Sequence, residues 1–127
     1  MSTRANIFVD YEGERIQYYH HYDGYPEGVG KMLASYLNIA TYIAPERTTA
    51  GVRKQFLELL KLDKGFEREE IGLHGDIEYL YFVKFIDNEK DVITFTKLKW
   101  ENKSEQLSKL ERAKQGDQEL ELKLEIK

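Results

Sequence analysis

Residues 76–86 constrain the fold more than any other part of the sequence. Their side chains alternate with the period of two that is typical of a β-strand, and apolar residues occur on both faces. One face carries Ile77, Tyr79, Tyr81, Val83 and Phe85, and the other carries Glu78, Leu80, Phe82, Lys84 and Ile86. A strand that is apolar on both faces must be covered on both sides. We therefore predict that this segment is a central strand.

Other segments also carry strand patterns. Residues 5–10 and 15–21 are β-prone and flank a glycine turn, which predicts a β-hairpin with His20 and His21 on opposite faces. Residues 92–100 alternate after a polar turn and predict a second hairpin with the central strand. Residues 119–127 alternate leucine or isoleucine with charged residues, which predicts a strand with one buried and one solvent-exposed face.

Two helices are predicted between the two hairpins. Pro26 suits the first position of a helix, and an apolar stripe at helical spacing continues to Ile43 before Pro45 ends it. A second helix is expected from Thr48 or Thr49 to a C-terminal cap at Gly65. Residues 101–117 are polar with only a thin apolar stripe, so they form either a short solvated helix or a mobile connector.

This order of elements predicts an α+β fold. We expect a single globular domain over residues 1–127, with a mostly antiparallel five-stranded sheet and two helices packed on one face. The predicted order is two strands, two helices and three strands. A parallel Rossmann-type fold would require regular alternation of strands and helices, which the sequence lacks.

Composition excludes several classes of function. The 127 residues contain no cysteine, which rules out disulfide scaffolds, thiol catalysis and iron–sulfur clusters. Acidic residues outnumber basic ones by 23 to 19, for a net charge of −4, so neither non-specific nucleic-acid binding nor an anionic membrane partner is expected. The sequence shows no apolar leader and no apolar run of membrane-spanning length, so we expect a cytoplasmic protein.

A polar block lies between the second predicted strand and the first predicted helix, over residues 20–31. Such junctions are favoured ligand sites, because the free N–H groups of a helix start attract anions. The block departs from the phosphate loop of nucleotide hydrolases. Gly30 follows Gly24 by six positions instead of five, and Lys31 precedes Met32 rather than Ser or Thr. Hydrolysis of nucleoside triphosphates is therefore not expected.

A second polar block, residues 72–79, leads into the predicted central strand. Together the two blocks contain a pair of H-x-D motifs, His21-x-Asp23 and His74-x-Asp76. Two histidines with carboxylates can bind a divalent metal or share a proton in acid–base chemistry. The structural alternative is that each aspartate only orders its own turn. The absence of cysteine and of a G-x-S-x-G motif argues against nucleophilic acyl transfer.

Three motifs resemble a family of small uncharacterised proteins of bacteriophages and prophages. They are Ser2-Thr3-Arg4-Ala5 near the start, HYDGYPEG over residues 21–28 and HGDIEY over residues 74–79. The similarity covers roughly the first two thirds of the chain, and Tyr22 departs from the pattern. The resemblance implies a phage-type accessory protein that acts in the bacterial cytoplasm on host enzymes or defence signals. It implies no mechanism.

Our leading hypothesis is a non-enzymatic binding module for a small nucleotide-like ligand. The two blocks would meet and form a polar pocket. The candidate ligand-binding residues are Arg4, His21, Asp23, Tyr25, Lys31, His74, Asp76 and Glu78. Arg4 or Lys31 would bind phosphate, Tyr25 would stack on a base, and Asp76 or Glu78 would bind hydroxyl groups. No catalytic residue, metal or cofactor is part of this hypothesis.

Two alternatives come from other classes of function. The chain could be an interaction protein that inhibits a host macromolecule through its acidic, tyrosine-rich surface, with both blocks serving only as turns. It could instead be a metal-dependent or acid–base hydrolase centred on His21, Asp23, His74 and Asp76.

Overall fold

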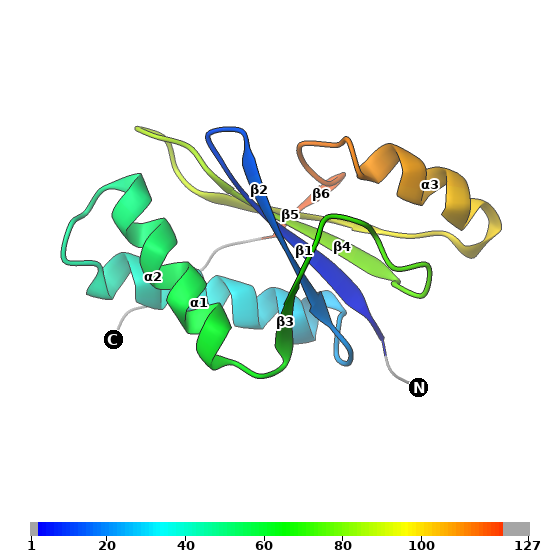
Figure 1. Ribbon diagram of the computed structural model, residues 1–127, viewed down its shortest axis with the longest axis horizontal. Helices are drawn as coiled ribbons and strands as arrows, with labels where there is room; N and C mark the ends of the chain where they lie inside the picture. The colour runs from blue at the N-terminus through cyan, green and yellow to red at the C-terminus, as the bar shows by residue number, and fades with distance from the viewer. Residues whose placement is uncertain (1–2, 121–127) are drawn as a thin grey trace.

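The computed structural model describes residues 3–120 and shows an α+β fold (Figure 1). A six-stranded sheet is combined with three α-helices. The strands are β1 (Ala5–Tyr11), β2 (Glu14–His20), β3 (Phe66–Glu69), β4 (Tyr79–Phe85), β5 (Val92–Lys97) and β6 (Gln118–Glu119). The helices are α1 (Lys31–Ile43), preceded by a π-helical turn over Pro26–Gly30, α2 (Thr49–Leu62) and α3 (Lys103–Leu110), preceded by a 3₁₀ turn over Trp100–Asn102. Among the described residues, no helix is both long and apolar enough to cross a membrane.

The sheet has the order β3-β2-β1-β4-β5-β6 and is mixed. β1 and β4 run parallel at its centre, and the other neighbouring pairs are antiparallel. The sequence pattern missed β3 because that strand has four residues, of which only Phe66 is apolar. The strand expected over 119–127 lies mostly outside the described residues, and within them Gln118 and Glu119 pair with β5.

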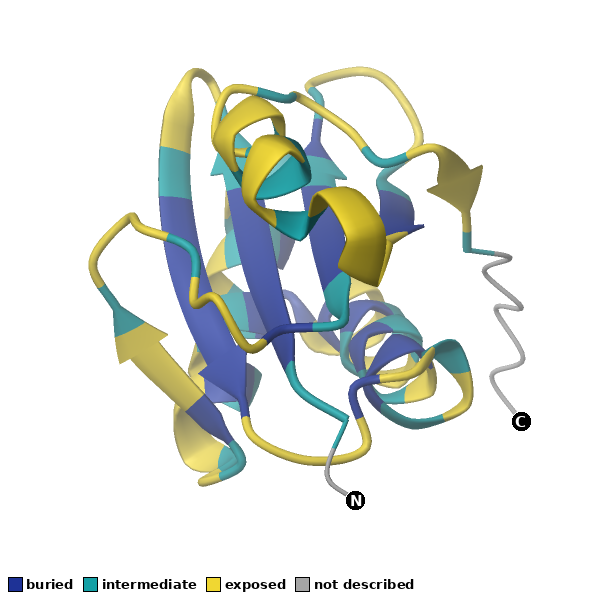
Figure 2. Cartoon of the chain, turned by 90° about the vertical axis from the view of Figure 1, so that its right-hand side faces the viewer, coloured by how far each residue is buried: buried dark blue, intermediate teal, exposed yellow. Residues whose placement is uncertain are grey.

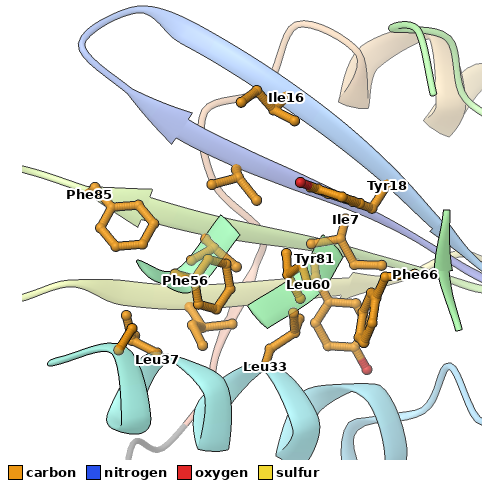
Figure 3. Packing of buried hydrophobic residues seen from close by; sticks show 14 of the residues in the cluster. Ile7, Ile16, Tyr18, Leu33, Leu37, Phe56, Leu60, Phe66, Tyr81 and Phe85 are labelled. Carbon is orange, nitrogen blue, oxygen red and sulfur yellow. The ribbon is translucent and has the colours of Figure 1, made fainter. Parts of the chain in front are cut away.

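One face of the sheet is covered by α1 and α2, as the two-helix pattern predicts. Leu33 and Leu37 of α1 point toward the sheet, and Phe56 and Leu60 of α2 lie between the helices and the strands (Figure 3). On the sheet side the buried residues include Ile7, Val9, Tyr18, Tyr81 and Val83. Each large apolar side chain buried in this way stabilises the fold by about 1.5–3 kcal/mol.

The opposite face is covered by α3 and by the segment between β3 and β4 (Figure 2). Phe8 and Phe82 lie there edge to face, with ring centroids 5.6 Å apart, beneath the half-buried Leu110. β4 is therefore a central strand buried on both faces, as its pattern predicts. The expectation of two helices was incomplete, because the thin apolar stripe of residues 101–117 does form a helix and closes this second face.

Two local details differ from the sequence pattern. The central strand begins at Tyr79 instead of residue 76, and Ile77 packs with Tyr19 and Leu98 on the α3 side, not on the face of Tyr79. The β1–β2 hairpin has the expected glycine turn, but the strand pairing extends to Tyr11 and Glu14, so the turn has only two residues. Glu12 and Gly13 both adopt positive φ angles, of 49° and 80°.

Candidate functional site

Two segments that are far apart in sequence meet at one rim of the sheet. Because β1 and β4 are parallel, their first residues Ala5 and Tyr79 lie side by side, and Ala5 also pairs with His20 at the end of β2. The segment that follows β2 and the segment that precedes β4 therefore start from the same edge. The sequence predicted that the two polar blocks meet. The parallel pairing of β1 with β4, which causes them to meet, was not predicted.

Five side chains form what we call the rim cluster: Arg4, Tyr19, His21, His74 and Asp76. The Arg4 guanidinium lies 3.2 Å from the Asp76 carboxylate, and its Nε donates to His21 Nδ1 over 3.4 Å. The Tyr19 hydroxyl lies 3.3 Å from His21 Nδ1 and 3.4 Å from Asp76 Oδ2. The His74 ring stacks on the Tyr19 ring at 4.2 Å. Burial, followed by the charge of Asp76, raises the pKa of the Tyr19 hydroxyl.

A buried polar network lies next to the rim cluster, and sequence reasoning missed it. Asn6 and Gln17 are both fully buried, and both donate to Glu69 Oε1, over 2.7 and 2.6 Å. Gln17 also donates to the Gly72 carbonyl and accepts from the Gly72 N–H, each over 3.0 Å. The other Glu69 oxygen lies 2.6 Å from His74 Nε2. This network holds residues 69–74 against β1 and β2.

Not every predicted site residue joins the rim cluster. Asp23 accepts a hydrogen bond from the Tyr25 hydroxyl at 3.0 Å, so these two side chains face each other. That bond, together with the charge of Asp23, raises the pKa of the Tyr25 hydroxyl. Lys31 is exposed at the start of α1. Glu78 contributes its main chain, since its N–H donates to the Arg4 carbonyl over 2.8 Å and its carbonyl accepts from Leu98.

Main-chain packing explains why positions 24 and 28 of the HYDGYPEG block are glycine. The N–H of Gly24 donates to the Thr3 carbonyl over 2.8 Å, and its carbonyl accepts from the buried Tyr81 hydroxyl over 2.6 Å. A Cβ on Gly28 would overlap the carbonyl oxygen of Asp23, which itself accepts from the Val29 N–H. Close backbone approach, rather than contact with a ligand, accounts for both glycines.

The donor arrangement does not favour the metal-dependent alternative. Across the described residues, no group of three or more His, Cys, Asp or Glu side chains is placed to hold a metal ion. His74 is engaged with Glu69, Asp76 with Arg4, and Asp23 with Tyr25. Of the four residues proposed for a hydrolase, only His21 and Asp76 share polar partners within residues 3–120, and these partners are Arg4 and Tyr19.

His20 and His21 point in opposite directions, as strand alternation predicts. His21 is exposed in the rim cluster, whereas His20 is 1% exposed and packs against the rings of Tyr22 and Phe66. Burial lowers the pKa of the His20 imidazole below its usual value near 6.5, although its hydrogen bond to the Tyr22 carbonyl opposes the shift. The folded protein thus favours neutral His20.

His20 is expected to make stability depend on pH. Its contribution is complete above pH 6.5, and it is lost as the pH falls from there toward the lowered native pKa, because the unfolded chain takes up the proton first. Urea unfolding from pH 5 to 8 should show a slope that is reduced in His20→Gln, by up to about 1.4 kcal/mol per pH unit. His21→Gln is the control and should keep the slope. Equal slopes in the two variants would contradict this role for His20.

No protein-family model, curated protein or solved structure matches this chain. Its function must therefore be inferred from the chemistry of its own residues.

Proposed function

We propose that this protein is a non-enzymatic binding module and that the rim cluster recognises a small nucleotide-like ligand. The observation that carries the proposal is the position of Arg4. It contacts His21 in the segment after β2 and Asp76 in the segment before β4. The Arg4 and Asp76 side chains remain 34% and 45% exposed, so a ligand can reach them. The Arg4 guanidinium thus lies where the segment after β2 meets the segment before β4.

The cluster offers the groups that a nucleotide requires. A phosphate competes with the Asp76 carboxylate for the Arg4 guanidinium, which binds both kinds of oxyanion with the same geometry. Asp76, once released, accepts hydrogen bonds from sugar hydroxyl groups. Tyr22 and Tyr25 are 51% and 38% exposed in the adjacent loop, and exposed aromatic rings are stacking platforms for bases.

The resemblance of the three motifs to phage and prophage proteins adds a cellular setting to this proposal. In that setting the protein is a phage-type accessory protein in the bacterial cytoplasm, where nucleotide-like molecules serve as metabolites and as signals. A binding module needs no catalytic group to act there, because sequestering a ligand lowers its free concentration.

Arg4→Gln is expected to weaken nucleotide binding by about tenfold or more, because it removes the charge-assisted contact to phosphate. Isothermal titration with nucleoside mono-, di- and triphosphates measures the effect. Arg47→Gln removes the same charge from an exposed position between α1 and α2 and should bind like the parent protein. Equal losses in both variants, or no binding of any nucleotide at millimolar concentration, would contradict the proposal.

A second candidate function is interaction with another protein. Ile39, Tyr42 and Ile43 share one face of α1 and are 43%, 62% and 47% exposed. Exposed apolar side chains at helical spacing favour contact with a macromolecule. A saturable protein partner that leaves the rim cluster accessible, together with the absence of nucleotide binding, would favour this function over the first.

A further inference from the structure

We infer that a pocket at the opposite end of the sheet from the rim cluster is a second ligand site, for a small organic dianion such as a phosphomonoester with an apolar group. The pocket has a volume of about 450 Å³, within the range of about 300–1,000 Å³ typical of small-molecule sites. Its lining residues belong to the β1–β2 turn, the end of β4 and residues 112–114 after α3. Figure 1 shows the course of the chain through these elements.

One lining residue, Arg15, makes several polar contacts that connect the walls of the pocket. Arg15 forms a two-point contact with Asp10, over 2.7 and 2.8 Å, and its guanidinium lies 4.1 Å from the centre of the Phe8 ring. It also donates to the carbonyls of Glu111 and Ala113, over 3.1 and 2.5 Å. Arg15 thus joins the chain after α3 to the sheet, and the pocket wall is held in place without a ligand.

The remaining charges of the pocket are mostly positive. Lys84, Arg112 and Lys114 line it, and none of the three takes part in an ion pair among residues 3–120. Of the lining carboxylates, Asp10 is paired with Arg15 and Glu14 with Arg53. Only Glu12 then opposes the three cations. In a chain with a net charge of −4, this local excess favours an anion with more than one negative charge.

Most of the exposed lining of the pocket is apolar. Ala113 lines the pocket from the segment after α3 and packs against the Phe8 and Phe82 cluster on that face of the sheet. Tyr11 and Phe85, which are Cα partners at the ends of β1 and β4, also line it, although their side chains pack into the core beneath α1 and α2. An apolar group beside the anionic one therefore fits this pocket better than an inorganic ion.

The pocket is separate from the rim cluster. The rim cluster lies at Ala5, the first residue of β1, and the pocket begins at Asp10 and Tyr11, its last two. At about 3.3 Å per residue, the two sites are roughly 20 Å apart. This inference does not depend on the function proposed for the rim cluster, and either site can fail without the other.

Titration of the ¹⁵N-labelled protein with phenyl phosphate, followed by NMR, tests the inference. We expect saturable shifts of the amides of residues 11–14, 84–85 and 112–114, with little change at residues 4, 19–21 and 74–76. Lys84→Gln should weaken this binding by about tenfold, because one of the three cations is lost. Lys54→Gln, an exposed position in α2, removes the same charge and should leave the binding unchanged.

Three results would overturn the inference. The first is the absence of saturable shifts around the pocket at about 10 mM phenyl phosphate, a concentration that detects binding in the millimolar range. The second is equally strong binding of benzyl alcohol, because a neutral ligand does not need the cations. The third is an equal effect of Lys84→Gln and Lys54→Gln. Unfolding curves of both variants confirm that each is folded before it is titrated.

Discussion

Replacing Asn6 with alanine is expected to lower the free energy of unfolding by about 3 kcal/mol. The Asn6 side chain is fully buried and donates to the Tyr18 carbonyl over 3.1 Å and to Glu69 over 2.7 Å, while it accepts from the His74 N–H over 3.2 Å. Alanine leaves all three groups without this partner, and each buried polar group that loses its partner costs about 1 kcal/mol or more. The segment before β4 should also loosen.

Urea unfolding near pH 7.5 measures the loss, and hydrogen exchange of residues 70–78 reports the loosening. Asn38→Ala is the matched control, because the Asn38 side-chain oxygen is buried in α1 without a hydrogen-bond partner among the described residues. That change should be neutral or slightly stabilising, since alanine is the better helix former. If the two variants unfold at the same urea concentration, Asn6 does not hold the segment in place.

Gly28→Ala is expected to lower stability by about 3 kcal/mol, the upper part of the range for introduced steric overlap. The added Cβ would overlap the Asp23 carbonyl oxygen, which accepts from the Val29 N–H and closes the turn before α1. Relief of the overlap requires movement of the main chain around Asp23, whose φ is already positive at 51°. The neighbouring Gly24 carbonyl would then lose its bond from the buried Tyr81 hydroxyl.

Gly75→Ala provides the comparison, because a Cβ at Gly75 meets no atom within 4 Å. Thermal unfolding of both variants should show a large fall in the midpoint for Gly28→Ala and almost none for Gly75→Ala. A Gly28→Ala protein as stable as the Gly75→Ala protein would show that the HYDGYPEG turn tolerates a side chain there. The glycine would then need an explanation other than packing.

Much of the fold follows from local pattern. The alternation before Phe85 identified β4 as a strand buried on both faces, and the glycine turn at Gly13 identified the first hairpin. Strand alternation also predicted that His20 and His21 point apart, which the burial of one and the exposure of the other confirm. These features depend on neighbours one to four residues apart, so the amino-acid order carries them directly.

The missed features depend on contacts between distant segments. β3 has one apolar residue in four and exists because it pairs with β2 at an edge of the sheet. Asn6 and Gln17 are polar residues in strands, and nothing near them in sequence shows that Glu69 and Gly72 would be their partners. The cationic pocket likewise combines the first hairpin with residues after α3, roughly a hundred positions later.

By itself, the amino-acid sequence determined the α+β class, the main strands and helices, and the two polar loops, because hydrophobic period and turn residues act over short distances. Only the tertiary structure decided that β1 and β4 run parallel, and this brings Arg4 and Asp76 together. It also decided that Asp23 turns toward Tyr25 instead. Strand pairing is selected by the burial of both sheet faces at once, and that is a property of the whole chain.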